Sequence, residues 1–395
     1  MPDRKDSTLG AAVTMDDLGG ELHPLLARLR ESEPVSWLPA LGGWLVTRRD
    51  LALRVLRDSA AFTVDDPRFT TARVIGPSML SLDGAEHKRH RDPFADAFRR
   101  AGTGASMAEF VAAQAGQLVA ALAPAGQAEV RRGLAGPLAV AVVAEALGLG
   151  QTDPAQILAW YDAIVGAVSA LAGQPGGGAS PEGSEAFRML SQSLRQVIGG
   201  HGHSLLAAAA GAGGLGTGEV VSNAAVLLFG GIETTEGAIC NAVLYLLADP
   251  DQFRAVLADR SLVAAAVEES LRMEPAAAVV DRYATGDVSL AGAHIRRGDL
   301  VTVSLAGAGR DPAFFPGPDR FDVTRANARQ HLAFAHGPHF CLGADLARLE
   351  AGAAVAALLR LPGLRLDPGR RQGPRGVVFR KPPALHVLWD AGGQR

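Results

Sequence analysis

Apolar and polar residues alternate with helical spacing over most of this chain. Between Glu86 and Val220 apolar residues recur every three or four positions, with interruptions, and this spacing predicts a series of helices. The longest such pattern covers about 220–247 and is apolar on most of its faces, which predicts a helix buried through the centre of the protein. A further helix is expected directly after Cys341, where apolar residues again follow one face.

Strand patterns are short and stand on both sides of the helical region. We expect strands at 34–38, 43–47, 288–290, 294–295 and 300–305, and a helix around 51–56. Turns with glycine separate neighbouring strands. The prediction is a mainly α protein with a small antiparallel β part, and the sequence lacks the repeating βα alternation of a doubly wound fold.

Two glycine-rich segments interrupt the helices. Gly173–Ser184 lies between helical patterns at about 154–171 and 185–198, and we interpret it either as an inert linker or as the hinge of a mobile lid. Gly211–Gly216 matches the dinucleotide-binding pattern G-x-G-x-x-G literally, but that pattern is meaningful only after a strand. Because a helical composition precedes it, we interpret this segment as a connection between helices.

The composition is that of a soluble, compact protein. The 395 residues are 48% hydrophobic and 20% charged, and the length allows one large domain or two to three ordinary ones. The net charge is −3 and the arginines are scattered, so the sequence does not indicate a basic surface for nucleic acid. The N-terminus lacks the apolar segment of a signal peptide, and no apolar run approaches about 18 residues, so we expect a cytoplasmic protein.

The sequence contains only two cysteines, Cys240 and Cys341, which excludes a disulfide framework. Cys240 lies in a helical, apolar context and is interpreted as core packing. Cys341 follows histidines and glycines immediately before a helix, where unpaired N–H groups favour a thiolate, which is a metal ligand or a nucleophile. Three sites remain open from the residues alone: a Cys–His nucleophile pair, a heme-iron thiolate ligand, or a zinc site drawing on His331, His336, His339 and Cys341.

The segment around Cys341 also resembles a known family. Its pattern, Phe-x-x-Gly-x-His-x-Cys-x-Gly, is similar to the heme-binding loop of the heme-thiolate monooxygenases, the cytochrome P-450 superfamily, and is filled by Phe334, Gly337, His339, Cys341 and Gly343. Further patterns fall in the family's order: His87–Arg91, Gly230–Thr235, and Glu269–Arg272 followed by Pro318–Phe321. The resemblance runs from about residue 20 to the C-terminus, and the soluble bacterial type is most similar. Ala335 departs from the family, because many bacterial members carry glycine there.

The resemblance implies a heme b cofactor and the residues that would bind it. Cys341 would be the ligand of the heme iron, with Phe334 and Gly343 in the same cofactor loop. Two propionate carboxylates at the edge of a buried porphyrin need cationic or hydrogen-bonding partners. The resemblance gives this role to His87, Arg91, Arg282 and His339.

The same resemblance gives the long helix a role in oxygen chemistry. Gly230 and Gly231 would leave room for dioxygen above the iron. Thr234 and Glu233 would relay the protons that cleavage of the O–O bond requires. A simpler interpretation of Thr234 is a hydrogen bond from its hydroxyl back to the carbonyl of Gly230.

Glu269 and Arg272 lie three residues apart on a predicted helix, a spacing at which side chains meet. As a surface pair they would contribute less than about 1 kcal/mol. The resemblance instead implies a buried network with Arg320 that supports the thiolate loop and has a structural role. Removing one partner would cost about 3–5 kcal/mol, because it would leave a buried charge unpaired.

The resemblance also implies where the substrate pocket lies. The residues singled out in its walls are Ile75, Met79, Leu80, Leu227, Ala277, Val279 and Val378. These side chains are apolar and mostly small, so we expect a substrate with an apolar or aromatic body, although ordinary core packing explains about half of such residues. A heme pocket needs an opening that moves, which favours the lid interpretation of Gly173–Ser184.

The expected protein is a single heme-binding domain over residues 1–395 with a flexible N-terminus at 1–18. We expect a monomeric monooxygenase that hydroxylates, couples or cyclises a small organic molecule, with electrons from a separate ferredoxin and ferredoxin reductase. A basic face at Lys88, Arg89, His90 and Arg99 is a candidate docking surface. Abundant arginine, alanine and glycine point to bacterial natural-product metabolism. A zinc hydrolase and a non-enzymatic heme gas sensor or ligand carrier remain as alternatives.

Overall fold

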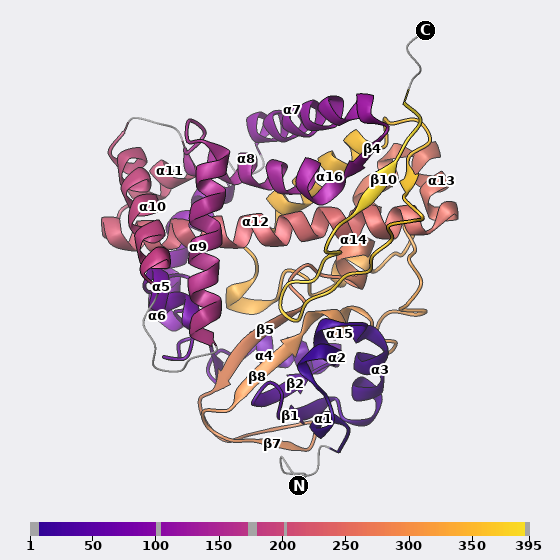
Figure 1. The fold of residues 1–395 in the computed structure, drawn as a ribbon. Coiled ribbons are helices and arrows are strands. Elements are labelled where there is room, and N and C mark those ends of the chain that lie inside the picture. Colours follow the sequence, from indigo (N-terminus) through magenta and orange to yellow (C-terminus); the bar gives the residue numbers. More distant parts are fainter. Residues whose placement is uncertain (1–7, 100–103, 173–179, 201–203, 392–395) are drawn as a thin grey trace. The chain divides into compact units, whose positions relative to one another are not determined.

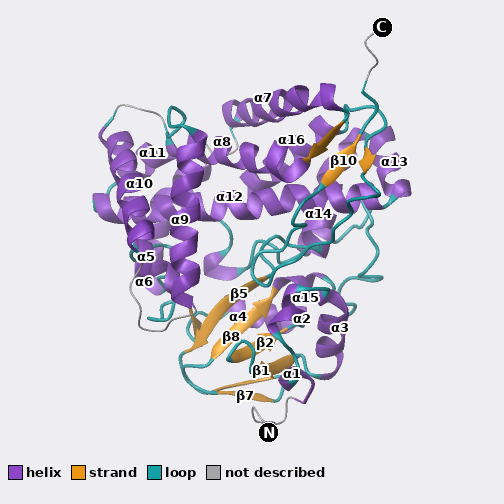
Figure 2. Ribbon diagram, viewed as in Figure 1, coloured by secondary structure: helices purple, strands orange, loops and turns teal. Residues whose placement is uncertain are grey.

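The structure is a computed structural model that describes residues 8–99, 104–172, 180–200 and 204–391 (Figure 1). Contacts divide the chain into two compact units. The sheet unit contains Met1–Thr63, Ala115–Ala135 and Thr234–Arg395, and the helical unit contains Val64–Gln114 and Gly136–Glu233. Helices predominate in both units (Figure 2), which confirms the mainly α prediction. The expected single domain over 1–395 stays a prediction.

The strands of the described residues belong to the sheet unit. Its main sheet contains, in spatial order, β1 (Val35–Leu38), β2 (Gly43–Val46), β8 (Leu300–Ser304), β5 (Val279–Ala284) and β3 (Phe62–Thr63). Smaller sheets pair β6 (Val288–Leu290) with β7 (Ala293–Ile295), and β10 (His386–Leu388) with β4 (Gln127–Glu129) and β9 (Arg365–Leu366). The predicted strands form, but β2 and β8 pair in parallel, which a search for local turns could not anticipate.

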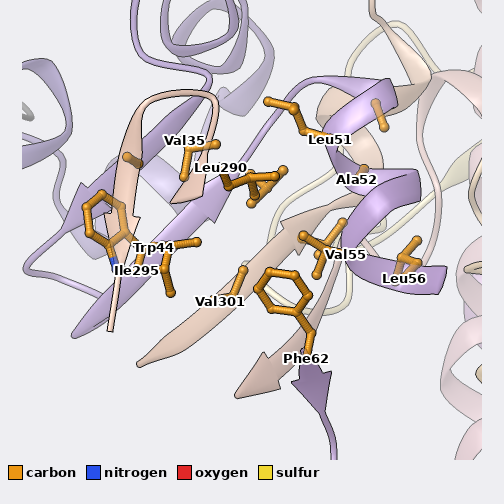
Figure 3. Close-up of a cluster of buried hydrophobic side chains, with 14 of the residues drawn as sticks. Val35, Trp44, Leu51, Ala52, Val55, Leu56, Phe62, Leu290, Ile295 and Val301 are labelled. Carbon is orange, nitrogen blue, oxygen red and sulfur yellow. The ribbon is translucent and has the colours of Figure 1, made fainter. Parts of the chain in front are cut away.

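Both faces of the main sheet are covered within this unit. On one face, the apolar side chains of α4 (Arg49–Arg57) pack over β8 and β3, as Figure 3 shows. Because side chains alternate along a strand, Val301 and Val303 point to this face, whereas Thr302 points to the other. Leucines of α2 (Met15–Gly19) and α3 (Leu22–Ser32) lie against that second face.

The N-terminal segment contains two short helices in its described part. Residues 8–18 include α1 (Thr8–Ala11) and most of α2, residues 1–7 lie outside the described part, and the flexibility expected over 1–18 stays a prediction. The carboxylate of Glu33 accepts hydrogen bonds from the N–H groups of Leu9 and Gly10 at 2.8 and 3.0 Å. A capping box at Thr14 starts α2, and Leu18 is buried.

Four further helices complete the sheet unit: α13 (Pro250–Ala258), α14 (Val263–Met273), α15 (Leu305–Gly309) and α16 (Ala344–Leu358). The helix expected after Cys341 is α16. Two longer helices, α7 (Ala105–Leu122) and α12 (Thr217–Ala248), have residues in both units, and the division of α12 falls between Glu233 and Thr234. The long helix predicted at about 220–247 is thus confirmed.

The helical unit also contains α5 (Thr70–Ile75), α6 (Gly84–Ala97), α8 (Gly136–Leu147), α9 (Pro154–Ala172), α10 (Pro181–Gly199) and α11 (Leu205–Gly211). The helices α9 and α10 lie side by side (Figure 1). The loop expected at 173–184 ends earlier than predicted. The hydroxyl of Ser180 accepts a hydrogen bond from the N–H of Gly183, and α10 begins at Pro181. Residues 173–179 lie outside the described part. Residues 212–216 connect α11 to α12, as predicted.

Two segments within the described ranges are long and apolar enough to cross a membrane by length and composition, Ala105–Ala125 and Pro154–Leu171. Core helices of soluble proteins meet the same two criteria. The second segment is α9, and its buried residues Ile157, Tyr161 and Ile164 recur at helical spacing. This face packs against other helices of the same unit.

Candidate active site

The loop that carries Cys341 is folded back on itself by backbone contacts. The N–H of Cys341 donates to the carbonyl of Phe334 at 2.9 Å, which closes the loop around a short 3₁₀ helix at Gly337–His339. At Gly337, φ is +75° and a side chain would come within 2.4 Å of the carbonyl oxygen of Leu56, so only glycine fits. These constraints hold Cys341 at the surface of the sheet unit, where the residue is exposed.

Ala335 occupies a strained position in this loop. Its φ is +57°, in the left-handed region that glycine adopts easily and that costs other residues about 1–2 kcal/mol. The methyl group of Ala335 is small, so the cost arises from the backbone conformation. The loop therefore stores strain next to Cys341 that a glycine would relieve.

The zinc alternative does not survive the geometry. Within the described residues no group of three or more His, Cys, Asp and Glu side chains could hold a metal ion. His331, one of the expected zinc ligands, instead hydrogen bonds to Glu268 at 3.0 Å and accepts the N–H of Ala333 at 3.1 Å. Cys240 is fully buried in α12, and burial raises the pKa of its thiol, which confirms its interpretation as core packing.

The donors of the sheet unit fit a heme with a thiolate ligand. Cys341 supplies an exposed thiol between the exposed Phe340 and the helix α16, with His339 two residues earlier. Arg282 of β5, a residue that is only 5% exposed, supplies a guanidinium, which is the kind of partner that a propionate carboxylate requires. Its Nη1 donates to the carbonyl of Asp281 at 2.7 Å.

The helical unit carries the other two expected propionate partners. His87 and Arg91 lie one turn apart on α6, and His87 is 5% exposed. The structure thus brings His87 and Arg91 together on one helix and places Arg282, His339 and Cys341 in the sheet unit.

The two glycines of α12 differ in their surroundings. A side chain at Gly230 would meet nothing within 4 Å, whereas one at Gly231 would come within 3.2 Å of Val143 on α8. A side chain at Gly230 would therefore point into open space, and its role at a dioxygen site stays a prediction. The small size of Gly231 also serves the close packing of α8 against α12, and its assignment to cofactor binding stays a prediction.

The carboxylate that follows these glycines has a partner on α9. The hydroxyl of Tyr161 donates to Oε2 of Glu233 at 3.0 Å, and the ring of Tyr161 lies near that of Phe229. Both Glu233 and Thr234 are partly exposed, so neither side chain is sealed into the core. Tyr161 is a candidate functional residue that sequence reasoning missed, since no local motif marks it.

The Glu269 network contains a different arginine from the one expected. Glu269 and Arg272 are fully buried and form a two-point ion pair at 2.7 and 2.8 Å. The third charged side chain is Arg325, whose Nε donates to Glu269 at 2.9 Å. The prediction for Arg320 was wrong: its guanidinium is exposed and pairs with Asp322, and only its carbonyl accepts a hydrogen bond from Arg272.

Sequence reasoning did not anticipate a second network one residue earlier on α14. Oε1 of Glu268 accepts a hydrogen bond from Arg348 at 2.6 Å, and Oε2 accepts one from His331. The guanidinium of Arg348 lies 4.5 Å from the ring of Phe334, and the His331 ring lies 5.6 Å from it. Burial opposes the charge of Glu268, but these hydrogen bonds lower its pKa to about 2. Glu268 is thereby linked to the loop that carries Cys341.

The residues expected in the substrate pocket divide between the units. In the helical unit, Ile75 and Met79 are buried, Leu80 and Leu227 are partly buried, and Ile75 lines a cavity of about 670 Å³. In the sheet unit, Val279 and Val378 line one groove of about 250 Å³, and Ala277 pairs with Phe379 beside Val378.

The basic face expected on α6 is largely neutralised. Lys88 pairs with Asp92, Arg99 pairs with Asp96, and Arg89 pairs with Glu86 and Glu219. His90 is 2% exposed and bonded to Asn223. The expectation of a cationic patch that includes His90 is therefore wrong, because the helical spacing that groups these basic residues also groups them with acidic ones.

Comparisons with known proteins agree on one family. The family Cytochrome P450 matches residues 202–383. Cytochrome P450 monooxygenase PikC of Streptomyces venezuelae is 37% identical over 95% of this chain and 93% of that protein, and mycinamicin IV hydroxylase/epoxidase of Micromonospora griseorubida is 34% identical over 91% and 94%. The crystal structure of CalO2 has a TM-score of 0.86 at 30% identity and covers 96% of this chain and 100% of that one. The chain therefore belongs to the cytochrome P450 family, and it is a heme-thiolate oxidoreductase.

Proposed function

We propose that this enzyme is a monooxygenase that oxidises a small organic molecule and that Cys341 is the thiolate ligand of its heme iron. The observation that carries the proposal is the exposed Cys341 in a loop held by two contacts: the backbone N–H of Cys341 donates to the carbonyl of Phe334, and Gly337 approaches Leu56 closely. Heme, when bound, supplies the centre at which dioxygen is activated with two electrons. The backbone contacts of the loop hold Cys341 in one position.

Four side chains are assigned to bind the propionate carboxylates of the heme. Arg282 offers a planar fork of N–H donors that can bind a carboxylate at two points, and His339 lies in the Cys341 loop. His87 and Arg91 present donors from the same face of α6. These residues orient the cofactor and take no part in bond cleavage.

Proton delivery is assigned to the middle of α12. The hydroxyl of Thr234 holds a proton at Oγ1 beside the open space at Gly230, and the carboxylate of Glu233 resupplies it. Adjacent residues of a helix do not face each other, so a water molecule must carry the proton between them. Tyr161 donates to Oε2 of Glu233 and so holds the carboxylate in one orientation.

Substrate class and partners follow from the relatives. Mycinamicin IV hydroxylase/epoxidase and nocardicin C N-oxygenase are named for hydroxylation, epoxidation and N-oxygenation of small organic molecules. We propose a comparable natural-product substrate here, with hydroxylation, oxidative coupling or ring closure as the reaction. A ferredoxin and a ferredoxin reductase supply the electrons, and the enzyme acts as a cytoplasmic monomer.

The absorption spectrum of the reduced, carbon monoxide-bound enzyme tests the ligand. The wild type should show the Soret band of a thiolate-ligated heme, Cys341→Ser should lose it, and the matched variant Cys240→Ser should keep it. A thiolate-type band in Cys341→Ser would overturn the assignment. Retention of bound heme is measured in parallel, so that loss of the cofactor is not mistaken for loss of the ligand.

Substitution at Thr234 tests the proton path. Thr234→Ala should lower product formed per electron pair by at least about tenfold, with hydrogen peroxide released instead, because the proton at Oγ1 is lost. Thr234→Ser keeps the hydroxyl and should retain most of the coupling. Equal coupling in all three proteins would assign Thr234 a structural role only.

A further inference from the structure

A groove of about 250 Å³ lies on the second face of the main sheet, between the strands and the helices α2 and α3. Leu22 of α3, Leu45 of β2 and Leu300 of β8 contribute apolar surface to it. Its rim includes Val378, which is 49% exposed, so the groove opens to solvent. We call it the Asp281 groove, after the carboxylate in its wall.

Strand register places Asp281 and Thr302 together in this groove, whose other lining side chains are apolar except for Ser304. Asp281 of β5 pairs with Thr302 of β8, and Thr302 pairs with Leu45 of β2, so all three side chains lie on the same face. The hydroxyl of Thr302 donates to Oδ1 of Asp281 at 2.7 Å. No described residue donates a hydrogen bond to Oδ2 of Asp281.

The carboxylate is not explained by an ion pair in the fold. The neighbouring Arg282 points to the opposite face of the sheet, and its guanidinium bonds to the carbonyl of Asp281, not to the carboxylate. Burial raises the pKa of Asp281 against the hydrogen bond from Thr302 and the attraction of Arg282. A carboxylate beside apolar side chains carries a desolvation cost, which a bound cation would offset.

We propose that the Asp281 groove binds the protonated amino group of an organic molecule, with Oδ2 of Asp281 as its acceptor and Leu45 and Leu300 beside its apolar chain. The volume is slightly below the roughly 300–1,000 Å³ of most small-molecule sites, so it holds a small amine or one end of a larger one. Charge complementarity selects a cation as the occupant, because the polar wall offers one negatively charged acceptor, the carboxylate of Asp281. Val279 and Val378 of this groove are also among the residues assigned to the substrate pocket, so the inference rests on the proposed function and names a chemical class of molecule for it.

Calorimetric titration of the heme-containing enzyme tests the groove with two probes of similar length. One is N,N-dimethylhexylamine, which is protonated at neutral pH and whose methyl groups hinder coordination to a metal; the other is neutral hexan-1-ol. The cation should bind at least about tenfold more tightly than the alcohol. Equal affinities for the two probes would overturn the proposal.

Two variants test whether Asp281 is the residue that binds the cation. Asp281→Asn keeps the size of the side chain and the acceptor for Thr302, and it should weaken cation binding at least about tenfold while leaving alcohol binding unchanged. Asp287→Asn removes the same charge from an exposed position outside the groove and should bind both probes as the wild type does. A cation affinity in Asp281→Asn equal to that of the wild type would sink the assignment.

A third variant tests where the probes bind, and a spectrum tests the thiolate ligand separately. Ala40→Phe places a ring into the groove and should abolish binding of both probes, whereas unchanged binding would place the probes elsewhere and contradict the proposal. The spectrum of the reduced, carbon monoxide-bound enzyme is recorded on the same samples. A thiolate-type band without cation preference overturns the groove alone, and cation preference without that band overturns only the ligand assignment of Cys341.

Discussion

Glu268 and Glu269 are neighbours on α14, yet their carboxylates belong to two different networks. Glu269 is fully buried and is bonded to Arg272 and Arg325, which are themselves buried. Glu268 is bonded to His331 and Arg348, and Arg329 approaches it from solvent at 3.5 Å. One residue along a helix rotates the side chain by about 100°, which is enough to separate the two networks.

The chemistry of their partners gives the two networks different roles, one in stability and the other at the site. The partners of Glu269 are arginines and backbone groups, which stay in one charge state at any physiological pH, so this network acts as a fixed brace. The partners of Glu268 include a histidine, and two of them contact Phe334 in the loop of Cys341. Glu268 thus links the helix α14 to that loop through these contacts.

The largest effect is expected from Glu269→Gln. It leaves two buried arginines without a counter-charge, so we expect a loss of about 3–5 kcal/mol in the free energy of unfolding. Urea denaturation at pH 7, followed by circular dichroism, measures it. Glu268→Gln is the matched control. Equal losses in the two variants would erase the distinction drawn between the networks.

Arg325→Ala and Arg320→Ala form the next pair. Arg325 is buried and bonded to Glu269, so its removal should cost about 1.5–3 kcal/mol. Arg320 is 74% exposed and pairs only with Asp322 by its side chain, so its removal should cost less than about 1 kcal/mol. The two thermal midpoints should differ accordingly. A larger loss in Arg320→Ala would restore the original expectation for that residue.

The third charged side chain of the Glu269 network is Arg325 and not the expected Arg320, which shows what the sequence alone does not predict. A motif and helical spacing identify Glu269 and Arg272, because both lie on one helix. The third partner depends on a turn: Asp322 accepts hydrogen bonds from the N–H and hydroxyl of Thr324, and the chain reverses so that Arg325 points inward. The hydrophobic periodicity of the sequence does not predict this turn.

The same limit applies to the fold. Local patterns predicted the long helix α12, the helix α16 and the strands β1 and β2, since each depends on its own residues. The parallel pairing of β2 with β8 depends on two segments that are far apart in the sequence. The left-handed Ala335 and the roles of His331 and Tyr161 likewise depend on distant partners, which a single sequence does not show.

Glu268→Gln should have a smaller effect on stability and a larger one on the site. Because Arg348 can turn towards solvent, we expect a loss of about 1–2 kcal/mol at pH 7. The pKa of Glu268 is lowered from 4.5 to about 2, so its stabilisation is complete above about pH 4.5 and is lost as the pH falls towards 2. Urea midpoints measured from pH 7 to pH 3 should therefore converge for variant and wild type.

The site readout for Glu268→Gln is spectroscopic. If the carboxylate positions the Cys341 loop through His331, Arg348 and Phe334, the reduced, carbon monoxide-bound variant should lose part of its thiolate-type band at pH 7. Glu268→Asp keeps the charge and should retain more of the band. An unaltered spectrum in the glutamine variant would show that Glu268 stabilises the fold without positioning the loop.

The smallest effects are expected from the two arginines near Glu268, Arg348 and Arg329. Arg348 is 21% exposed, donates to Glu268 and lies over the ring of Phe334, so Arg348→Ala should cost about 1 kcal/mol and broaden the thiolate-type band. Arg329 is 77% exposed and only approaches Glu268 at 3.5 Å, so Arg329→Ala should cost less than about 0.5 kcal/mol and leave the spectrum unchanged. Both variants remove one positive charge near the same carboxylate. If they changed the spectrum equally, net charge near Glu268 would govern the loop, and the contact of Arg348 with Phe334 would not.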